Sequence, residues 1–438
     1  MTRANELQTA RKVLIVHVGL GVGFGIALIL TIMSPGGVVA TDFTVFWTGW
    51  WLILSGQAPL LYDAGAQRAA QHMLMAGAQF QGGLMAFINP PHVALAGVPF
   101  GWLADHAGER AAFLVWTAGS VALLVRLDRW LREAWGETDG PSPWLLTSAL
   151  VAFYPVFQTL NIGQVSLLLG VAVLGLYRAI DSSQPRSGAA WLLALSIKPQ
   201  LMPALLVFLV ARRCWGVIAY AAAMMLVAGS LTAALLGPLI WVDYAVHLGE
   251  LEHFWGTGTP AHMRNVRGLL TRLPGFMGQP AIDAVSLGIW VTATLLLAVV
   301  FLYFRIHRLQ DSRPTYSFAV AAGLLVSPHL FVQDVLIWTV PLVLYAGALR
   351  DAGRRWRPFA TFALCWPTLF ALGHILDLRM GGGPAISVIS QIAALVVATA
   401  MIGVGTWRLS VAGNGIRTRP SSSLDRTRVV VATDHRDG

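Results

Sequence analysis

Charged residues, cysteines and lysines are all scarce in this sequence. Charged residues are 12% of the 438, about half the share found in soluble globular domains. A soluble enzyme of this length would need far more polar surface, and a disordered chain would need far fewer apolar residues, so both classes are excluded. The two cysteines, Cys214 and Cys365, cannot build a disulfide framework or a zinc site.

Hydrophobic residues, in contrast, make up 56% of the chain, and the mean hydropathy is +0.65. The apolar runs are long and continuous, which is not the alternating pattern of a β-barrel. The first run, 13–33, has no charged residue and no small-residue cleavage site, so it reads as a retained membrane span rather than a signal peptide. The sequence therefore predicts an all-α fold, a polytopic transmembrane helical bundle.

Further apolar runs follow at intervals along the chain. If residues 87–103 enter the membrane and return, about 12 spans remain, and the polar stretches 34–84 and 237–283 become two large extracytoplasmic loops. Residues 41–55 are expected to form a helix in the membrane interface, where tryptophans are favoured. The predicted spans are 13–33, 110–127, 143–157, 165–177, 188–198, 200–211, 215–236, 284–304, 316–331, 333–349, 358–376 and 385–407.

The distribution of basic residues sets the predicted orientation. The chain has a net charge of +9, and in this topology 23 of its 30 basic residues fall on one side, which the positive-inside rule makes cytoplasmic. We attribute this excess of basic residues to membrane topology rather than to a nucleic-acid partner. We therefore expect a multi-pass protein of the inner (plasma) membrane. Residues 1–408 would form the membrane domain, and the basic stretch 409–438 a disordered cytoplasmic tail.

Several polar residues gather on the predicted extracytoplasmic face. Asp42 is a carboxylate beside apolar surface, which could act as a base near neutral pH, or could simply be the acid at the start of a helix. Lys198 lies between two short apolar runs, and an ammonium at that depth suggests an anionic partner such as a lipid phosphate, or else a side chain that snorkels to the interface. Asn161 and Gln164 belong to a short turn on the same face.

Two further groups complete the candidate site. Arg264 and Arg267 could clamp a phosphate or belong to a solvated loop. His329 could be a ligand, an acid or an ordinary hairpin histidine, and Asp334 is its nearest candidate partner in the sequence. No metal and no cofactor are expected. The pair most similar to an Asp-x-Asp motif is Glu250 with Glu252, and we interpret it as part of a solvated helix face.

With these residues in view, the chain resembles the GT-C membrane glycosyltransferases, and most closely glycosyltransferase family 87, the polyprenol-phosphate-mannose-dependent α-1,2-mannosyltransferases. The similarity covers roughly residues 40–345, with Ser166 standing where asparagine is common. The matching segments are TDFTVFWTGWWLILSGQAPLLYD (41–63), NPPHVALAGVPFGWL (89–103), NIGQVSLLLG (161–170), LLALSIKPQLMPALLVFLVARR (192–213), NVRGLLTRL (265–273) and LLVSPHLFVQDVLIW (324–338).

The resemblance implies an inverting transfer of a hexose, mannose in the family, from a polyprenyl-phosphate donor to a glycan or glycolipid acceptor on the extracytoplasmic face. It implies that Asp42 takes the acceptor proton and that Lys198, Arg264, Arg267 and His329 meet the phosphate. A lipid-linked saccharide transporter or flippase is the main alternative, although no paired halves are visible in the sequence. A non-catalytic membrane partner that has kept the fold is the third. The oligomeric state is left open.

Overall fold

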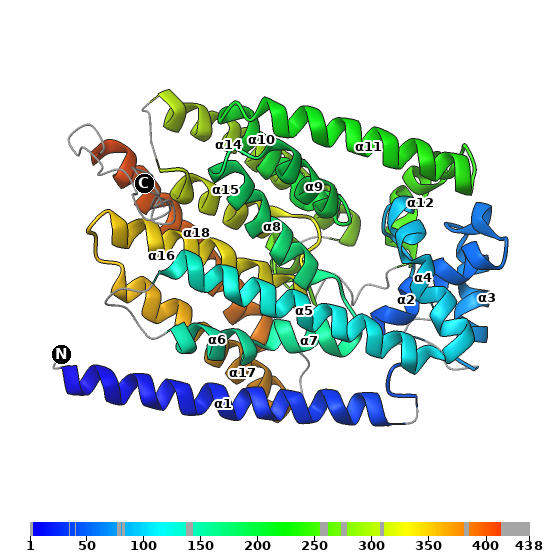
Figure 1. Ribbon diagram of the computed structural model, residues 1–438, viewed down its shortest axis with the longest axis horizontal. Coiled ribbons are helices and arrows are strands. Elements are labelled where there is room, and N and C mark those ends of the chain that lie inside the picture. Colours follow the sequence, from blue (N-terminus) through cyan, green and yellow to red (C-terminus); the bar gives the residue numbers. More distant parts are fainter. Residues whose placement is uncertain are drawn as a thin grey trace, which may run out of the picture.

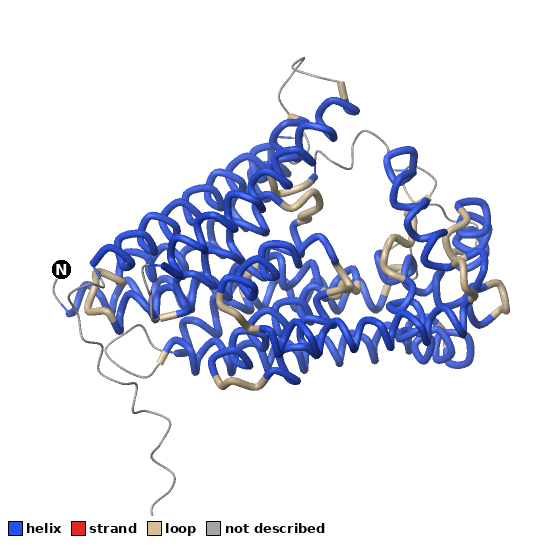
Figure 2. Tube along the Cα trace, turned by 90° about the horizontal axis from the view of Figure 1, so that it is seen from above, coloured by secondary structure: helices blue, strands red, loops and turns tan. Residues whose placement is uncertain are grey.

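The computed structural model describes residues 3–34, 36–39, 41–76, 80, 84–136, 143–254, 262–272, 278–306, 311–380 and 385–412. All regular structure in these residues is helical, and none of them lies in a strand (Figure 2). The predicted all-α fold is therefore confirmed. The predicted tail begins inside the last helix, and residues 413–438 lie outside the described residues.

Figure 1 shows the arrangement of the helices. In chain order they are α1 (Arg3–Met33), α2 (Asp42–Leu54), η1 (Ala58–Leu60), α3 (Ala64–Leu74), α4 (Pro91–Ala107), α5 (Glu109–Trp135), α6 (Pro143–Val151), α7 (Tyr154–Ile162), α8 (Ser166–Asp181), α9 (Pro185–Leu195), η2 (Pro199–Leu201), α10 (Met202–Ala211), α11 (Trp215–Leu236), α12 (Ile240–Phe254), α13 (Val266–Thr271), α14 (Gln279–Ile306), α15 (Ser312–Val326), η4 (Val332–Trp338), α16 (Thr339–Asp351), α17 (Arg357–Met380) and α18 (Ala385–Ala412).

Six stretches of helix in the described residues are long and apolar enough to cross a membrane, and the bent pair α6–α7 could supply a seventh span. The chain is thus a multi-pass membrane protein. Helices α9 and α10 have 11 and 10 residues, so each rises only about 16 Å, well short of a bilayer core of about 30 Å. They form a hairpin that reaches part of the way across. The count of twelve spans is not confirmed and stays a prediction.

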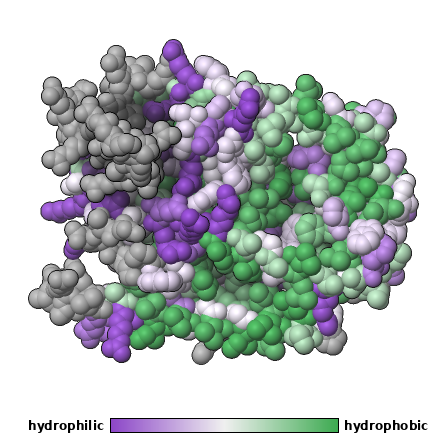
Figure 3. All heavy atoms as spheres, in the orientation of Figure 1, coloured by the Kyte–Doolittle hydropathy of each residue, from purple (hydrophilic) through white to green (hydrophobic). Residues whose placement is uncertain are grey.

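The helix ends that carry many arginines lie together. Arg178 of α8 pairs with Glu133 of α5 at 2.8 Å, and Arg313 pairs with Asp351 at 2.7 Å. Helix α1 also begins and helix α18 also ends on this side, at the left of Figure 1, where hydrophilic side chains gather in Figure 3, while hydrophobic side chains run along α1. Arg178 also lies over the ring of Trp130, so these contacts join, in pairs, four segments that the sequence placed on one membrane side: 126–132 with 178–187, and 305–313 with 350–357. We call this side the basic end.

Helices α2, α3, α4 and α12 lie at the opposite end of the molecule in both Figure 1 and Figure 2. The helix expected over 41–55 exists, and two of its tryptophans, Trp47 and Trp50, are buried in the protein. Helix α4 lies close against Trp50, because Gly97 and Gly101 have no side chain to keep the two apart. Trp50 also packs against Phe100 of α4 and Trp116 of α5.

Candidate active site

Asp42 opens helix α2 and is held by the turn that follows helix α7. Gly163 ends α7 in a left-handed conformation (φ 73°), and a Cβ atom there would lie 2.7 Å from the Cβ of Phe43. Only glycine therefore allows this turn to lie against the start of α2. The turn brings the Nε2 of Gln164 within 2.5 Å of the Oδ2 of Asp42, so the amide donates a hydrogen bond to the carboxylate.

Lys198 stands at the tip of the α9–α10 hairpin and meets a carboxylate from a distant part of the chain. Its ammonium donates to Oδ1 of Asp334 at 2.6 Å, and the hydroxyl of Ser166 donates to the same oxygen at 2.6 Å. The lysine side chain is 13% exposed and the aspartate 2%. The ammonium points inward to Asp334, which is not the orientation that snorkelling to the interface would require.

Asp42 shares this environment. Burial raises the pKa of the Asp42 carboxyl above its usual range, while the hydrogen bond from Gln164 and the charge of Lys198 lower it and the charge of Asp334 raises it again. Gln164 bonds Asp42, and Ser166, two residues later, bonds Asp334, so one turn joins Asp42 to the Lys198–Asp334 pair. We call these three charged groups, Asp42, Lys198 and Asp334, the Asp42 cluster. The structure thus brings together Asp42, Gln164, Lys198 and Asp334.

His329 lies in the loop between α15 and η4, and Arg267 approaches it from α13. Asn265 fixes this contact, because its side chain caps α13 at the amide of Gly268 and also donates to the carbonyl of Ser327. Arg267 donates to Asp283 at 2.7 Å, and its Nη1 lies 3.5 Å from Nδ1 of His329.

The protonation of His329 follows from this environment. Burial first, then the charges of Arg267 and Lys198, lower the pKa of His329 to about 3, so the imidazole is neutral at neutral pH. An arginine can only donate, so Nδ1 accepts from Arg267 and Nε2 carries the proton. Asp334, the nearest candidate partner of His329 in the sequence, accepts its hydrogen bonds from Lys198 and Ser166. His329 can therefore offer a neutral N–H donor.

Arg264 and Asn161 are placed differently. The backbone amide of Arg264 donates to the carbonyl of Leu330 at 2.6 Å, but its guanidinium turns toward Gln391 of α18. The structure does not bring it to Lys198 or Asp42. Asn161 lies on the last turn of α7, and its buried Oδ1 has no hydrogen-bond partner in the described part of the chain.

Three site residues were missed by sequence reasoning. Ser166 lies two residues after Gln164, so its position beside the site could be predicted from the sequence. Its hydrogen bond to Asp334 could not. Asp283 and Gln391 lie in apolar helices without any local signal. Only the packing of α14 and α18 against α13 reveals them.

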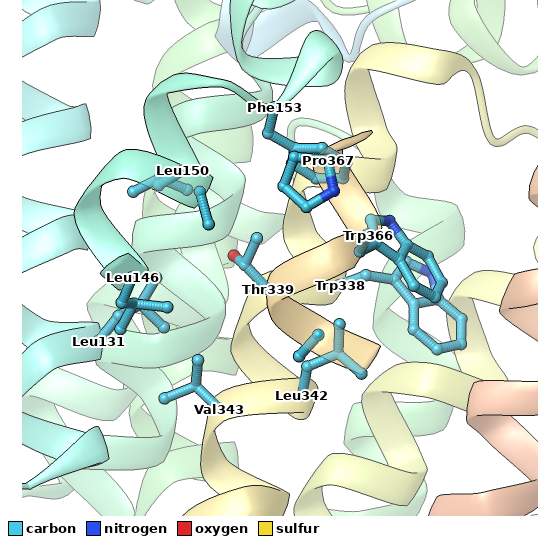
Figure 4. A pocket seen from close by; sticks show the side chains of 12 residues that line it. Leu131, Leu146, Leu150, Phe153, Trp338, Thr339, Leu342, Val343, Trp366 and Pro367 are labelled. Atoms are coloured by element: carbon cyan, nitrogen blue, oxygen red, sulfur yellow. The ribbon is translucent and has the colours of Figure 1, made fainter. Parts of the chain in front are cut away.

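Two other features bear on where a ligand could bind. The described residues contain no group of three or more His, Cys, Asp or Glu side chains placed to hold a metal ion. Figure 4 shows an apolar cavity between α5, α6, α16 and α17, lined by residues such as Leu146, Phe153, Trp338 and Trp366. None of its lining residues is charged, so it lacks the cations that a phosphate requires.

Comparison with known proteins decides the family. A profile of glycosyltransferase family 87 matches residues 87–328, more than half of the chain. The chain belongs to glycosyltransferase family 87. It is therefore a membrane glycosyltransferase, and the resemblance seen in the sequence is confirmed. The matched region of this family 87 chain includes Gln164, Lys198 and Arg267, while Asp42, His329 and Asp334 lie outside it. No curated protein and no solved structure matches the chain.

Proposed function

We propose that this family 87 enzyme moves a hexose, mannose by its family resemblance, from a polyprenyl monophosphate to a glycan or glycolipid acceptor on the extracytoplasmic face of the inner membrane. One observation carries the proposal: a buried carboxylate, Asp42, is held by Gln164 beside the Lys198–Asp334 pair. A carboxylate with a raised pKa is suited to act as a base. An adjacent cation is suited to stabilise a leaving phosphate.

In the proposed reaction Asp42 accepts the proton of the acceptor hydroxyl as that oxygen attacks C1 of the sugar. The new C1–O bond forms as the bond from C1 to the phosphate oxygen breaks on the opposite face, which inverts the anomeric centre. The electron pair of the broken bond leaves with the polyprenyl phosphate. Proton transfer by such a base typically contributes 10²- to 10⁴-fold to the rate.

The leaving phosphate is stabilised by donors that the protein has already placed. Lys198 exchanges its contact with Asp334 for the phosphate, while Arg267 and the neutral N–H of His329 supply further hydrogen bonds. Arginine, lysine and histidine can meet a monophosphate, which carries less charge than the pyrophosphate of a nucleotide sugar. We therefore expect activity in excess chelator and with no added cofactor.

The proposal is tested with purified protein, radiolabelled polyprenyl-phosphate mannose and a panel of candidate acceptor lipids. Label should move to a lipid acceptor, no label should move from a nucleotide sugar, and excess chelator should leave the rate unchanged. Turnover with a nucleotide sugar and no lipid carrier would overturn the proposed donor. Loss of activity in chelator that a divalent ion restores would overturn the proposed handling of the phosphate.

Gln164→Leu should shift the pH dependence of transfer. A base works when deprotonated, so activity is present above the raised pKa of Asp42 and is lost as pH falls through it. The Gln164 hydrogen bond stabilises the carboxylate, and without it the pKa of Asp42 rises further. In kcat/KM profiles the acidic limb should therefore move to higher pH.

The matched control for this shift is Gln184→Leu, since Gln184 is exposed in the turn between α8 and α9, at the other end of α8 from the site. Its profile should overlay that of the wild type. An unchanged acidic limb in Gln164→Leu would mean that a group other than Asp42 titrates in that limb.

The proposed orientation predicts the outcome of reporter fusions. With the basic end cytoplasmic, fusions after residue 60 and after residue 260 should read as extracytoplasmic, and a fusion at the C-terminus as cytoplasmic. A cytoplasmic signal at either internal position would place the Asp42 cluster on the wrong side for a donor delivered outside.

A further inference from the structure

His92 joins helix α4 to the tip of the α9–α10 hairpin. Its Nε2 lies 3.0 Å from the Oγ of Ser196, the residue that ends α9. The Ser196 hydroxyl has one proton, which it donates to the carbonyl of Leu193 at 2.6 Å. Towards the imidazole the serine oxygen can therefore only accept, so Nε2 of His92 carries a proton and donates it. This bond joins two residues that are 104 positions apart in the sequence.

The imidazole of His92 is itself held in place. Its ring stacks on Trp241 of α12, with the ring centroids 6.0 Å apart and an angle of 25° between the planes. Trp241 is fixed in turn, because its indole N–H donates to the carbonyl of Gly229 in α11 at 3.1 Å. The stacking restricts the orientation of the imidazole, so its N–H stays directed at Ser196.

The non-helical segment that leads into His92 is also fixed by side chains. Gln67, buried in α3, accepts a hydrogen bond from the backbone amide of Phe87 at 2.7 Å. The hydroxyl of Tyr62 donates to the carbonyl of Asn89 at 2.7 Å, three residues before His92. The start of α4 therefore has a defined position, which it can pass on to the hairpin.

Helix α4 contacts both halves of the candidate active site. Because Gly97 has no side chain, α4 can lie against Trp50 of α2, the helix that begins at Asp42. The first turn of α4 bonds Ser196, which precedes Lys198 by two residues. The same helix thus relates the position of the proposed base to that of the proposed cation.

Lys198 needs a second restraint in the proposed reaction. In the structure its ammonium is held by Asp334 at 2.6 Å. The reaction breaks this contact when the ammonium moves to the leaving phosphate, and a misplacement of about 1 Å at that point can cost about a hundredfold in rate. The hydrogen bond from His92 to Ser196 does not involve the ammonium, so it can hold the hairpin tip throughout.

We infer that His92 is a positioning residue for Lys198, which holds the tip of the α9–α10 hairpin so that the ammonium reaches the leaving phosphate. The inference rests on the role proposed for Lys198 in the transfer. His92 acts on Lys198 through Ser196 and the turn that joins them, so its effect requires the lysine.

Equilibrium binding of a polyprenyl monophosphate tests the inference with full-length protein in phosphatidylcholine nanodiscs. His92→Phe keeps a ring for Trp241 but has no donor, and it should weaken binding about tenfold. His92→Gln, whose side-chain amide can donate from nearly the same place as Nε2, should restore most of the affinity. His106→Phe is the matched control and should bind as the wild type does, because His106 also stacks on a tryptophan but is exposed at the other end of α4.

The same change in a protein without the ammonium shows whether His92 acts through Lys198. In the paired variant Lys198→Met with Asp334→Asn, adding His92→Phe should weaken binding by less than about twofold, because the group that His92 positions is already absent. Ser196→Ala, which removes the acceptor, should weaken binding as His92→Phe does. It decides the question if His92→Phe does not fold.

Three results would overturn the inference. The first is unchanged binding in both His92→Phe and Ser196→Ala. The second is equal loss in His92→Phe and His92→Gln, which would assign the effect to the ring rather than to its donor. The third is a further tenfold loss when His92→Phe is added to the paired variant. Wild-type binding in the paired variant itself would instead contradict the role proposed for Lys198, so the two failures are distinguishable, and neither measurement needs turnover.

Discussion

Asp42→Asn should abolish nearly all hexose transfer while the protein still folds and inserts. Asparagine keeps the size of the side chain and can still accept the hydrogen bond from Gln164, but it cannot take the acceptor proton. The expected loss in kcat is about 10²- to 10⁴-fold, the usual contribution of a general base. Donor binding should be little changed, because the phosphate contacts come from other residues.

Asp105→Asn provides the matched control, since Asp105 is exposed on the last turn of α4. Both variants should have the melting temperature of the wild type, and only Asp42→Asn should lose turnover. Near-normal turnover in Asp42→Asn would remove Asp42 from the mechanism and return it to the role of an acid at a helix start.

Lys198→Met should damage both stability and catalysis, and the two effects can be separated. Removing the ammonium leaves the carboxylate of Asp334 buried without a counter-ion, which costs about 3–5 kcal/mol. The same change removes the cation proposed to meet the leaving phosphate. The melting temperature should fall, and the rate with the polyprenyl-phosphate donor should fall further than stability alone explains.

The double variant Lys198→Met with Asp334→Asn separates the two roles. It removes both charges and still leaves Ser166 an acceptor, so the melting temperature should recover. Transfer should not recover, because the phosphate still lacks its cation. Recovery of transfer together with stability would mean that Lys198 only balances Asp334 and does not act on the donor.

The sequence was enough to select charged residues of the candidate site, but not to predict which residues they contact. Asp42 and Lys198 stood out because a charge beside long apolar runs is costly and needs a reason. Asp334, the partner of Lys198, lies 136 residues away, and no local pattern connects the two. His329 and Asp334 show the same limit: they lie five residues apart in sequence, but Arg267 contacts His329 while Lys198 and Ser166 contact Asp334.

The apolar runs were enough to predict where helices form. They were not enough to predict how far each helix extends across the membrane. Hydropathy cannot distinguish a helix that crosses the membrane from the α9–α10 hairpin, whose two arms are short yet apolar. Trp47 and Trp50 fit an interfacial helix by composition, and only the close approach of α4 at Gly97 shows why they are buried. Grouping the arginines by membrane side was more successful, because the ion pairs of the basic end join segments that were assigned together.

The most direct measurement follows both lipids in proteoliposomes that contain the purified protein and a donor with ¹⁸O in the bridge between C1 and phosphorus. We expect one hexosylated acceptor for each polyprenyl monophosphate released, with the ¹⁸O retained in the phosphate and the anomeric centre inverted. Donor that crosses the bilayer intact without forming product would identify a transporter. Label that moves to the acceptor together with phosphorus would contradict the proposed bond cleavage.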